Sequence, residues 1–268
     1  MKKNKKKIVC LQTTSSKDPQ KNINMLEELF AKISSKADLI CLPECVAVFT
    51  DKRKEINFFL EKYRESFFNL ISYQAKKKKS VILVGSVPER FNDSKFVNRS
   101  YVFDDRGFQK SRYDKINLFD VNLSNTENYF ETKNYASGKK LIVSDLVWGK
   151  LGMSICYDLR FPNLYRSLGR KGAHFFSIPA AFTFTTGKAH WHSLIRARAI
   201  ENGCFVFAPA QCGVHDNGRR TYGHSMIVNP WGKVLVEAKH DKKQVISKTI
   251  NISEIQEYRN KIPSMTKF

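Results

Sequence analysis

Short apolar runs alternate with segments of helical periodicity along this chain, and that alternation limits its fold more than any other feature. Residues 8–14 are predicted to form a first strand. Ile23, Leu26 and Ile33 then recur at helical spacing, and a second strand is expected over residues 38–42. The order strand, helix, strand is typical of an α/β protein.

The same alternation continues to the C-terminal region. A long amphipathic helix is expected over residues 56–71, followed by a lysine run at 76–79 that suits a helix C-terminus. Further helices are expected over residues 163–171 and 190–202. Further strands are expected over residues 81–87, 99–104, 109–113, 141–147, 150–155, 174–178, 205–210, 225–229, 234–237 and 245–250.

Length and composition predict one soluble unit. The chain has 268 residues, of which 42% are hydrophobic, so it can bury a large core, and we expect a single domain over residues 1–268. No apolar run approaches the roughly 18 residues that span a bilayer. The basic residues 1–7 precede an apolar stretch, residues 8–11, that is too short for an export signal, which predicts a cytoplasmic protein. The six cysteines are therefore expected to be reduced thiols.

Cys156 stands where an apolar strand breaks into a polar turn that contains Pro162. A cysteine at a strand-to-helix corner can face a cleft, where backbone N–H groups at the helix start and a nearby cation favour its thiolate. It is therefore a candidate nucleophile. The alternative is a buried core cysteine, which is the more common role of this residue.

A carboxylate and an ammonium group accompany this cysteine. Glu44 ends the apolar strand at residues 38–42, and Lys115 lies among the apolar and aromatic residues 113–119. Each charge is expected at the rim of a core, where its pKa can be tuned. With Cys156 they supply a base, a cation and a nucleophile, the parts needed for covalent attack on a carbonyl or nitrile carbon.

In this order and with these flanking patterns, the three residues resemble the nitrilase superfamily of carbon–nitrogen hydrolases. The resemblance implies the four-layer αββα sandwich of that family. The motifs at residues 196–202 and 222–232 resemble the branch of amidases that act on deaminated glutathione and on omega-amides of 2-oxo acids. The motifs that carry the resemblance beyond Glu44, Lys115 and Cys156 are residues 141–147, 177–182, 186–191, 196–202 and 222–232.

The resemblance implies a hydrolase that forms a thioester and releases ammonia or an amine, with Glu44 as general base, Lys115 as cationic stabiliser and Cys156 as nucleophile. Glu131 matches a second glutamate of the family, although it can equally be an ordinary loop carboxylate. Other substrates of the superfamily, N-carbamoyl amino acids and nitriles, stay open as alternatives. No cofactor and no metal is expected.

Four residues are predicted to contact the substrate. The Tyr157 N–H is expected to share the oxyanion with Lys115, and Phe182 lies in a family motif. Arg160 and Lys188 are candidate partners for a substrate carboxylate, or else members of structural salt bridges.

Two positions depart from the family pattern. Asn117 stands where many relatives have His, and His192 stands where many have Glu. Both are expected near the substrate. His190 and His192 are two apart on a predicted helix and so point to different sides, which argues against a catalytic zinc site.

The formal net charge is +21, from 46 Lys and Arg against 25 Asp and Glu, and such excess charge can bind nucleic acid. The basic residues are scattered and no nucleic-acid-binding signature accompanies them, so we expect a solvated surface and a small-molecule amide as ligand. We also expect a homo-oligomer, most simply a two-fold dimer. Its interface is predicted to include residues 190–202, with Trp191, Leu194, Ile195 and Arg198, and the tail 258–268, with Ile262, Met265 and Phe268.

Overall fold

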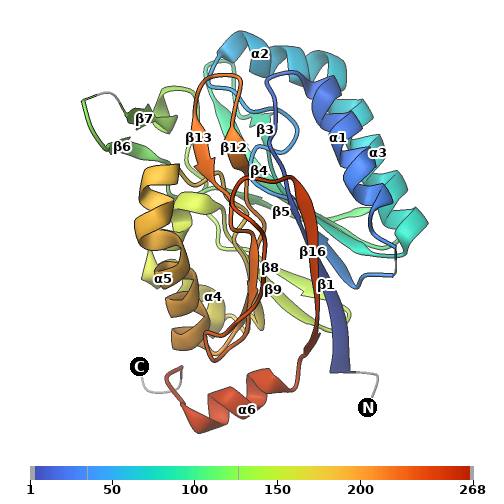
Figure 1. The fold of residues 1–268 in the computed structure, drawn as a ribbon, viewed down its shortest axis with the longest axis vertical. Helices are drawn as coiled ribbons and strands as arrows, with labels where there is room; N and C mark the ends of the chain where they lie inside the picture. The colour runs from blue at the N-terminus through green and yellow to red at the C-terminus, as the bar shows by residue number, and fades with distance from the viewer. Residues whose placement is uncertain (1–3, 35, 126, 266–268) are drawn as a thin grey trace.

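The computed structural model describes residues 4–34, 36–125 and 127–265, and it contains two six-stranded sheets that lie face to face (Figure 1). In each sheet three neighbouring strands pair in parallel, and each remaining strand pairs antiparallel with its neighbours. The first sheet has the order β16 (Gln244–Asn251), β1 (Lys5–Gln12), β2 (Leu39–Cys41), β3 (Val81–Arg90), β4 (Phe96–Phe103) and β5 (Gln109–Asp114). The second has the order β15 (Val234–Glu237), β14 (Met226–Val228), β11 (Phe205–Ala208), β10 (Phe175–Ser177), β9 (Gly149–Met153) and β8 (Val143–Leu146).

Helices cover the outer face of each sheet. Helices α1 (Pro19–Ala31) and α3 (Arg64–Lys78) pack on the first sheet, and α4 (Pro162–Arg170) and α5 (Phe184–Asn202) pack on the second (Figure 1). The layers therefore run helix, sheet, sheet, helix. The four-layer αββα sandwich expected from the sequence is confirmed.

The alternation of side chains along β1 shows why both faces of a sheet are apolar. Ile8 and Cys10 belong to the core between the two sheets, whereas Val9 and Leu11 belong to the core beneath α1 and α3. Successive side chains of a strand point to opposite faces. A strand buried on both faces therefore needs a continuous apolar run, which is the pattern that predicted it.

Most predicted elements are present, with shifted ends. The predicted helix 56–71 lies within a longer helical segment, composed of α2 (Arg53–Phe58), the π-helical turn η2 (Phe59–Tyr63) and α3. Helix α5 begins at Phe184, earlier than predicted, because the Thr183 side chain accepts a hydrogen bond from the Thr186 N–H and so caps the helix.

The sequence analysis missed two short hairpins and the last helix. The hairpins are β6 (Asp120–Asn122) with β7 (Asn128–Phe130), and β12 (Cys212–Val214) with β13 (Arg220–Tyr222); the helix is α6 (Glu254–Lys261). Three-residue strands are too short to show a period of two, and α6 buries only Ile255, so neither leaves an apolar pattern.

All six cysteines are free. Within the described ranges, no helix is both long and apolar enough to cross a membrane. Residues 1–3, which include the first two lysines of the basic start, and Phe268 of the predicted interface lie outside the described residues.

Candidate active site

The predicted base, cation and cysteine meet where strands of the two facing sheets end. Glu44 follows β2 of the first sheet, Lys115 follows β5, and Cys156 follows β9 of the second sheet. The carboxyl ends of parallel strands are the usual ligand site of an open α/β sheet. All three residues are buried, with 3%, 2% and 5% of their surface exposed, respectively.

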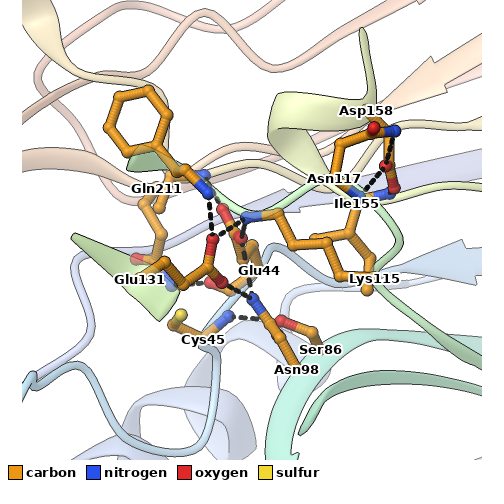
Figure 2. A network of polar contacts seen from close by, with 12 residues as sticks. Glu44, Cys45, Ser86, Asn98, Lys115, Asn117, Glu131, Ile155, Asp158 and Gln211 are labelled. Atoms are coloured by element: carbon orange, nitrogen blue, oxygen red, sulfur yellow. Dashed lines mark hydrogen bonds and ion pairs between the residues drawn. The ribbon is translucent and has the colours of Figure 1, made fainter. Parts of the chain in front are cut away.

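Lys115 lies between two carboxylates (Figure 2). Its Nζ is 2.9 Å from Glu44 Oε1 and 2.8 Å from Glu131 Oε2. Glu131 begins the short 3₁₀ helix η3 (Glu131–Lys133) and also accepts a hydrogen bond of 2.7 Å from the Phe119 N–H. The structure thus brings the second glutamate into the same network as the other predicted residues.

Asn98 joins the two carboxylates, and the sequence analysis missed it. Its Nδ2 donates to Glu44 Oε1 at 3.0 Å and to Glu131 Oε1 at 3.1 Å (Figure 2). The residue lies on β4 and is 4% exposed. A polar side chain inside a mostly apolar strand was the available signal, because a buried amide needs hydrogen-bond partners.

Backbone and amide contacts fix Glu44 from two further sides. Its second oxygen, Oε2, accepts a hydrogen bond of 2.7 Å from the Ala181 N–H. Its main-chain oxygen accepts one of 2.8 Å from Gln211 Nε2 (Figure 2). The carboxylate is therefore held in one orientation, as a general base requires.

Cys156 has a strained backbone. Its φ is +47°, in the left-handed region that non-glycine residues rarely adopt, and its N–H donates to the Pro179 oxygen at 2.9 Å. It is also the first residue of the 3₁₀ helix η4 (Cys156–Arg160). The sharp turn after β9 is thus centred on the cysteine, and such strain is concentrated at functional sites.

A buried aspartate connects the lysine loop to the cysteine turn. Asp158 is fully buried; its Oδ2 accepts hydrogen bonds from Tyr113 and from the Ile155 N–H, and its Oδ1 accepts from Asn117. Burial raises the pKa of Asp158, and the hydrogen bonds oppose that rise. Asn117 therefore positions the site from outside the cavity and does not line it, which corrects the expectation that it lies near the substrate.

Burial and the neighbouring charges favour the thiol form of Cys156. Burial raises the pKa of Cys156 well above its ordinary value, and the negative charge of Glu44 raises it further, whereas Lys115 lowers it. Burial opposes the charge of Lys115, but Glu131 and Glu44 raise its pKa well above the ordinary value. Burial also opposes the charge of Glu44, and Lys115 overcomes this effect and lowers its pKa. The expectation that Lys115 and a helix start lower the pKa of Cys156 is wrong, because burial, which cannot be judged from the sequence, raises it.

A cavity of about 290 Å³ opens onto Glu44, Lys115 and Cys156. Phe119, Tyr129, Phe130 and Tyr135 contribute aromatic walls to it. A wider cavity of about 590 Å³ adjoins it and shares the lining residues Cys45, Thr50, Asp51, Asn128, Tyr129 and Arg219. The buried reactive groups are thus reached through a wider, more open entrance.

Arg219 is a further cation that lines this cavity, and it was not predicted from the sequence. Its guanidinium lies 4.7 Å from the Tyr129 ring centre and 5.4 Å from that of Phe49, and its Nη2 donates to the Ala181 oxygen at 2.5 Å. Its Nε is buried and has no hydrogen-bond partner among the described residues. The residue as a whole is only partly buried and lines both cavities, so the exposed part of its guanidinium can meet an anionic ligand.

The four predicted substrate-binding residues divide into two groups. Tyr157 and Phe182 line a small recess together with Cys156. Arg160 instead packs 5.1 Å from the Phe182 ring centre and contacts His190 at 3.2 Å, and Lys188 is exposed on α5. Neither cation lines the cavity, which corrects the expectation that they bind a substrate carboxylate there.

His192 also lies away from the cavity. Its Nε2 is 2.9 Å from Glu237 Oε1 of β15, on the outer side of the second sheet, so the expectation that it lies near the substrate is wrong. Among the described residues, a group of side chains that could hold a metal ion is formed by His192, His224 and Glu237.

Comparisons with known proteins identify the relatives of this chain. The carbon–nitrogen hydrolase family model matches residues 7–260. A deaminated glutathione amidase of Yersinia enterocolitica is 36% identical over 96% of this chain and 90% of its own length. The omega-amidase NIT3 of Saccharomyces cerevisiae is 31% identical over 95% of this chain and 90% of its own length.

Solved structures give the same result. The C. elegans NitFhit protein superposes with a TM-score of 0.90 at 31% identity, over 99% of this chain and 65% of that longer chain. Saccharomyces cerevisiae Nit3, described as a member of branch 10 of the nitrilase superfamily, superposes with a TM-score of 0.83 at 28% identity, over 98% of this chain and 96% of that one.

The electrostatics of the site make a prediction about the thiol. Replacing Glu44 by Gln removes the negative charge that raises the pKa of Cys156 and leaves Lys115 in place, so that pKa should fall. The measurement is the alkylation rate of Cys156 against pH, followed by peptide mapping. Asp51→Asn, which removes another carboxylate from the cavity wall, is the matched control and should leave the profile unchanged. An unchanged or higher Cys156 pKa in Glu44→Gln would contradict this account.

Proposed function

The chain belongs to the carbon–nitrogen hydrolase family and is an enzyme of non-peptide C–N bonds, and we propose that it is an amidase with Cys156 as nucleophile and Glu44 as general base. The observation that carries this proposal is the buried network in which Lys115 joins Glu44 to Glu131 beside the cysteine. The proposed nucleophile, base and cation line one cavity, as covalent catalysis requires.

The first step forms a bond between the Cys156 sulfur and the amide carbon. Because the resting group is a thiol and Glu44 is ionised, Glu44 takes the proton as the sulfur attacks. The C=O electron pair moves onto oxygen and creates an oxyanion. Lys115 and the Tyr157 N–H are the donors proposed for it, and loss of one such donor typically costs on the order of 10²- to 10³-fold in rate.

The second step breaks the C–N bond. Glu44 returns its proton to the departing nitrogen, which leaves as ammonia or an amine, and a thioester with Cys156 remains. Glu44 then removes a proton from water as the water attacks the thioester carbon. The C–S bond breaks, the sulfur regains the proton from Glu44, and the carboxylic acid product departs.

Lys115, Glu131 and Asn98 support this cycle without exchanging protons. Glu131 helps to keep Lys115 cationic, because its charge raises the pKa of that ammonium group. Asn98 holds the two carboxylates at a fixed separation. Preorganised dipoles and charges of this kind need no reorganisation during the reaction.

We propose a small amide that also carries a carboxylate as the substrate. The relatives named deaminated glutathione amidase and omega-amidase support this class, and so does Arg219, a cation that lines the same cavity as Cys156. A carboxylate held by Arg219 would fix the amide end of the substrate toward Cys156. N-carbamoyl amino acids and nitriles are the competing substrates. Release of ammonia or of an amine, measured for deaminated glutathione, omega-amides, N-carbamoyl amino acids and nitriles, ranks the four classes.

A first experiment tests the catalytic pair. Cys156→Ala and Glu44→Gln should each lower kcat at least about 10²-fold, because general-base catalysis is typically worth 10² to 10⁴. Residues that act as one unit are not additive, so the double variant should be hardly slower than either single one. Cys212→Ala, a cysteine outside the cavity, is the control and should retain activity. A Glu44→Gln enzyme with more than about a tenth of wild-type activity would exclude the proposed base.

A second experiment tests Arg219. Arg219→Gln should lower kcat/KM for carboxylate-bearing amides by about 10- to 100-fold, the cost of a charged hydrogen bond of roughly 1.5–3 kcal/mol. An uncharged amide of the same length should be affected far less. Arg220→Gln is the matched control, because Arg220 stacks on Phe184 at 3.6 Å and lines only the outer cavity. Equal losses on both substrates would mean that Arg219 is structural.

We also propose that two copies of this chain associate. The burial of Trp191, Ile195 and Arg198 inside the chain removes them from any interface, which corrects part of the sequence prediction. Met265 is also packed inward, against Arg166. The outer surface near the end of α5 instead exposes Ile200, Trp231 and Ile262 by 45%, 52% and 48%.

These side chains form one patch. Ile200 lies beside Gly232, the neighbour of Trp231, and the Trp231 ring lies 5.3 Å from Tyr258 of α6, the helix that Ile262 follows. Aromatic and aliphatic side chains gathered on a surface suit the core of an interface. The same patch on both copies would make a two-fold contact.

Light scattering tests the association. Trp231→Glu should convert a dimer to a monomer at micromolar concentration, because a two-fold interface counts the added charge twice. Phe108→Glu is the matched control, because Phe108 is 62% exposed. It lies beside Lys76 and Arg106, whose positive charges would stabilise the introduced carboxylate. A wild-type protein that already runs as a monomer would refute the proposed contact and leave the catalytic proposal untouched.

A further inference from the structure

Two histidines and a glutamate from separate parts of the chain meet outside the catalytic cavity. His192 lies on α5, His224 follows β13, and Glu237 ends β15. Glu237 Oε1 is 2.9 Å from His192 Nε2 and 2.5 Å from His224 Nδ1. None of the three lines the cavity that contains Cys156, so the proposed amidase reaction leaves them without a role.

The surrounding structure holds both imidazole rings in place. His224 has a φ of +55°, and its main-chain oxygen accepts a hydrogen bond of 2.9 Å from the buried Trp191 indole. The Tyr222 ring stacks on His224 at 4.3 Å and meets the His192 ring edge-on at 6.0 Å. Helix α5 and β13 lie side by side, so this aromatic wall is part of the fold (Figure 1). A strained residue kept in one orientation points to a function for its side chain.

The donor set matches a zinc ion. Two imidazole nitrogens and one carboxylate oxygen are the protein ligands of one common type of zinc site, with water in the fourth position. Bond lengths of about 2.0–2.2 Å in a tetrahedron place neighbouring donors roughly 3.3 Å apart. The three donor atoms here lie within 4.8 Å of one another, so movements of about an ångström would complete the geometry.

The site is open to solvent on one side. The His192, His224 and Glu237 side chains are 35%, 23% and 31% exposed, respectively. Solvent can therefore deliver the ion and supply the fourth ligand. The carboxylate between the two imidazoles also provides negative charge that a divalent cation needs.

We propose that His192, His224 and Glu237 form a binding site for a divalent transition-metal ion, for which zinc is the best match. The bound ion ties helix α5 to the connection after β13 and to the end of β15. It acts on stability rather than on chemistry, because its ligands lie outside the cavity. The site is independent of the proposed amidase function.

Zinc binding to the full chain tests the site. Equilibrium dialysis is carried out in a Cys156→Ser background, so that the reactive thiol does not contribute. One zinc ion per chain should bind, and the melting temperature should rise with zinc concentration, as for any ligand of the native state. Cobalt(II) as a second probe should show no sulfur-to-metal charge-transfer band, because the proposed ligands are nitrogen and oxygen only.

Three variants locate the ion. His192→Gln and Glu237→Gln should each weaken zinc binding by at least tenfold and abolish the zinc-dependent rise in melting temperature. His240→Gln is the matched control, since the ring of His240 lies 5.8 Å from that of His224 but outside the ligand set. Circular dichroism confirms that each variant is folded. Absence of zinc binding, or binding that survives both ligand substitutions, would overturn the proposal and leave a plain ion-pair cluster.

Discussion

The buried Lys115 between Glu44 and Glu131 is the interaction on which the rest of the site depends. Removing one partner of a buried ion pair is strongly destabilising, because the remaining charge loses its compensation. Here two carboxylates face one ammonium group, and Arg219 supplies a second positive charge at the cavity wall. Asp51 and Lys133 also line this cavity and add one charge of each sign, so its three carboxylates and three cations balance without a thiolate.

That balance explains why the nucleophile rests as a thiol. A thiolate at Cys156 would add an uncompensated anion next to Glu44, and burial together with this repulsion raises the thiol pKa. In the proposed attack the proton moves to Glu44 while the new negative charge appears on the substrate oxygen. The negative charge of Glu44 is thereby replaced by one on the substrate oxygen, for which Lys115 is a proposed donor, and no additional anion has to be buried.

The sequence predicted the reacting groups better than their surroundings. Glu44, Lys115 and Cys156 follow apolar strands, and that pattern is visible in the chain. Arg219 lies in a hairpin whose strands are too short to leave a pattern, so its place in the cavity could not be predicted. Arg160 and Lys188 were candidates only because they are basic and near the motifs.

The direction in which each helix face points decides which basic side chains near the motifs reach the cavity. In helix α5, Trp191 and Ile195 point into the core, and Lys188 and His192 belong to other faces. Sequence periodicity shows that a helix has a buried face, but it does not show which sheet edge or loop lies opposite the remaining ones. A basic side chain that lies near a motif in the sequence can therefore lie on a helix face that does not meet the cavity.

Long-range charge and local charge act at different stages of binding. A net charge of +21 attracts anions to the whole surface, and salt screens this attraction within about 8 Å at physiological ionic strength. Arg219 is a local charge, because its guanidinium lines the cavity that contains Cys156. Attraction to the surface would speed the arrival of an anionic amide, whereas in the proposed binding mode Arg219 holds the carboxylate end of the amide away from Cys156.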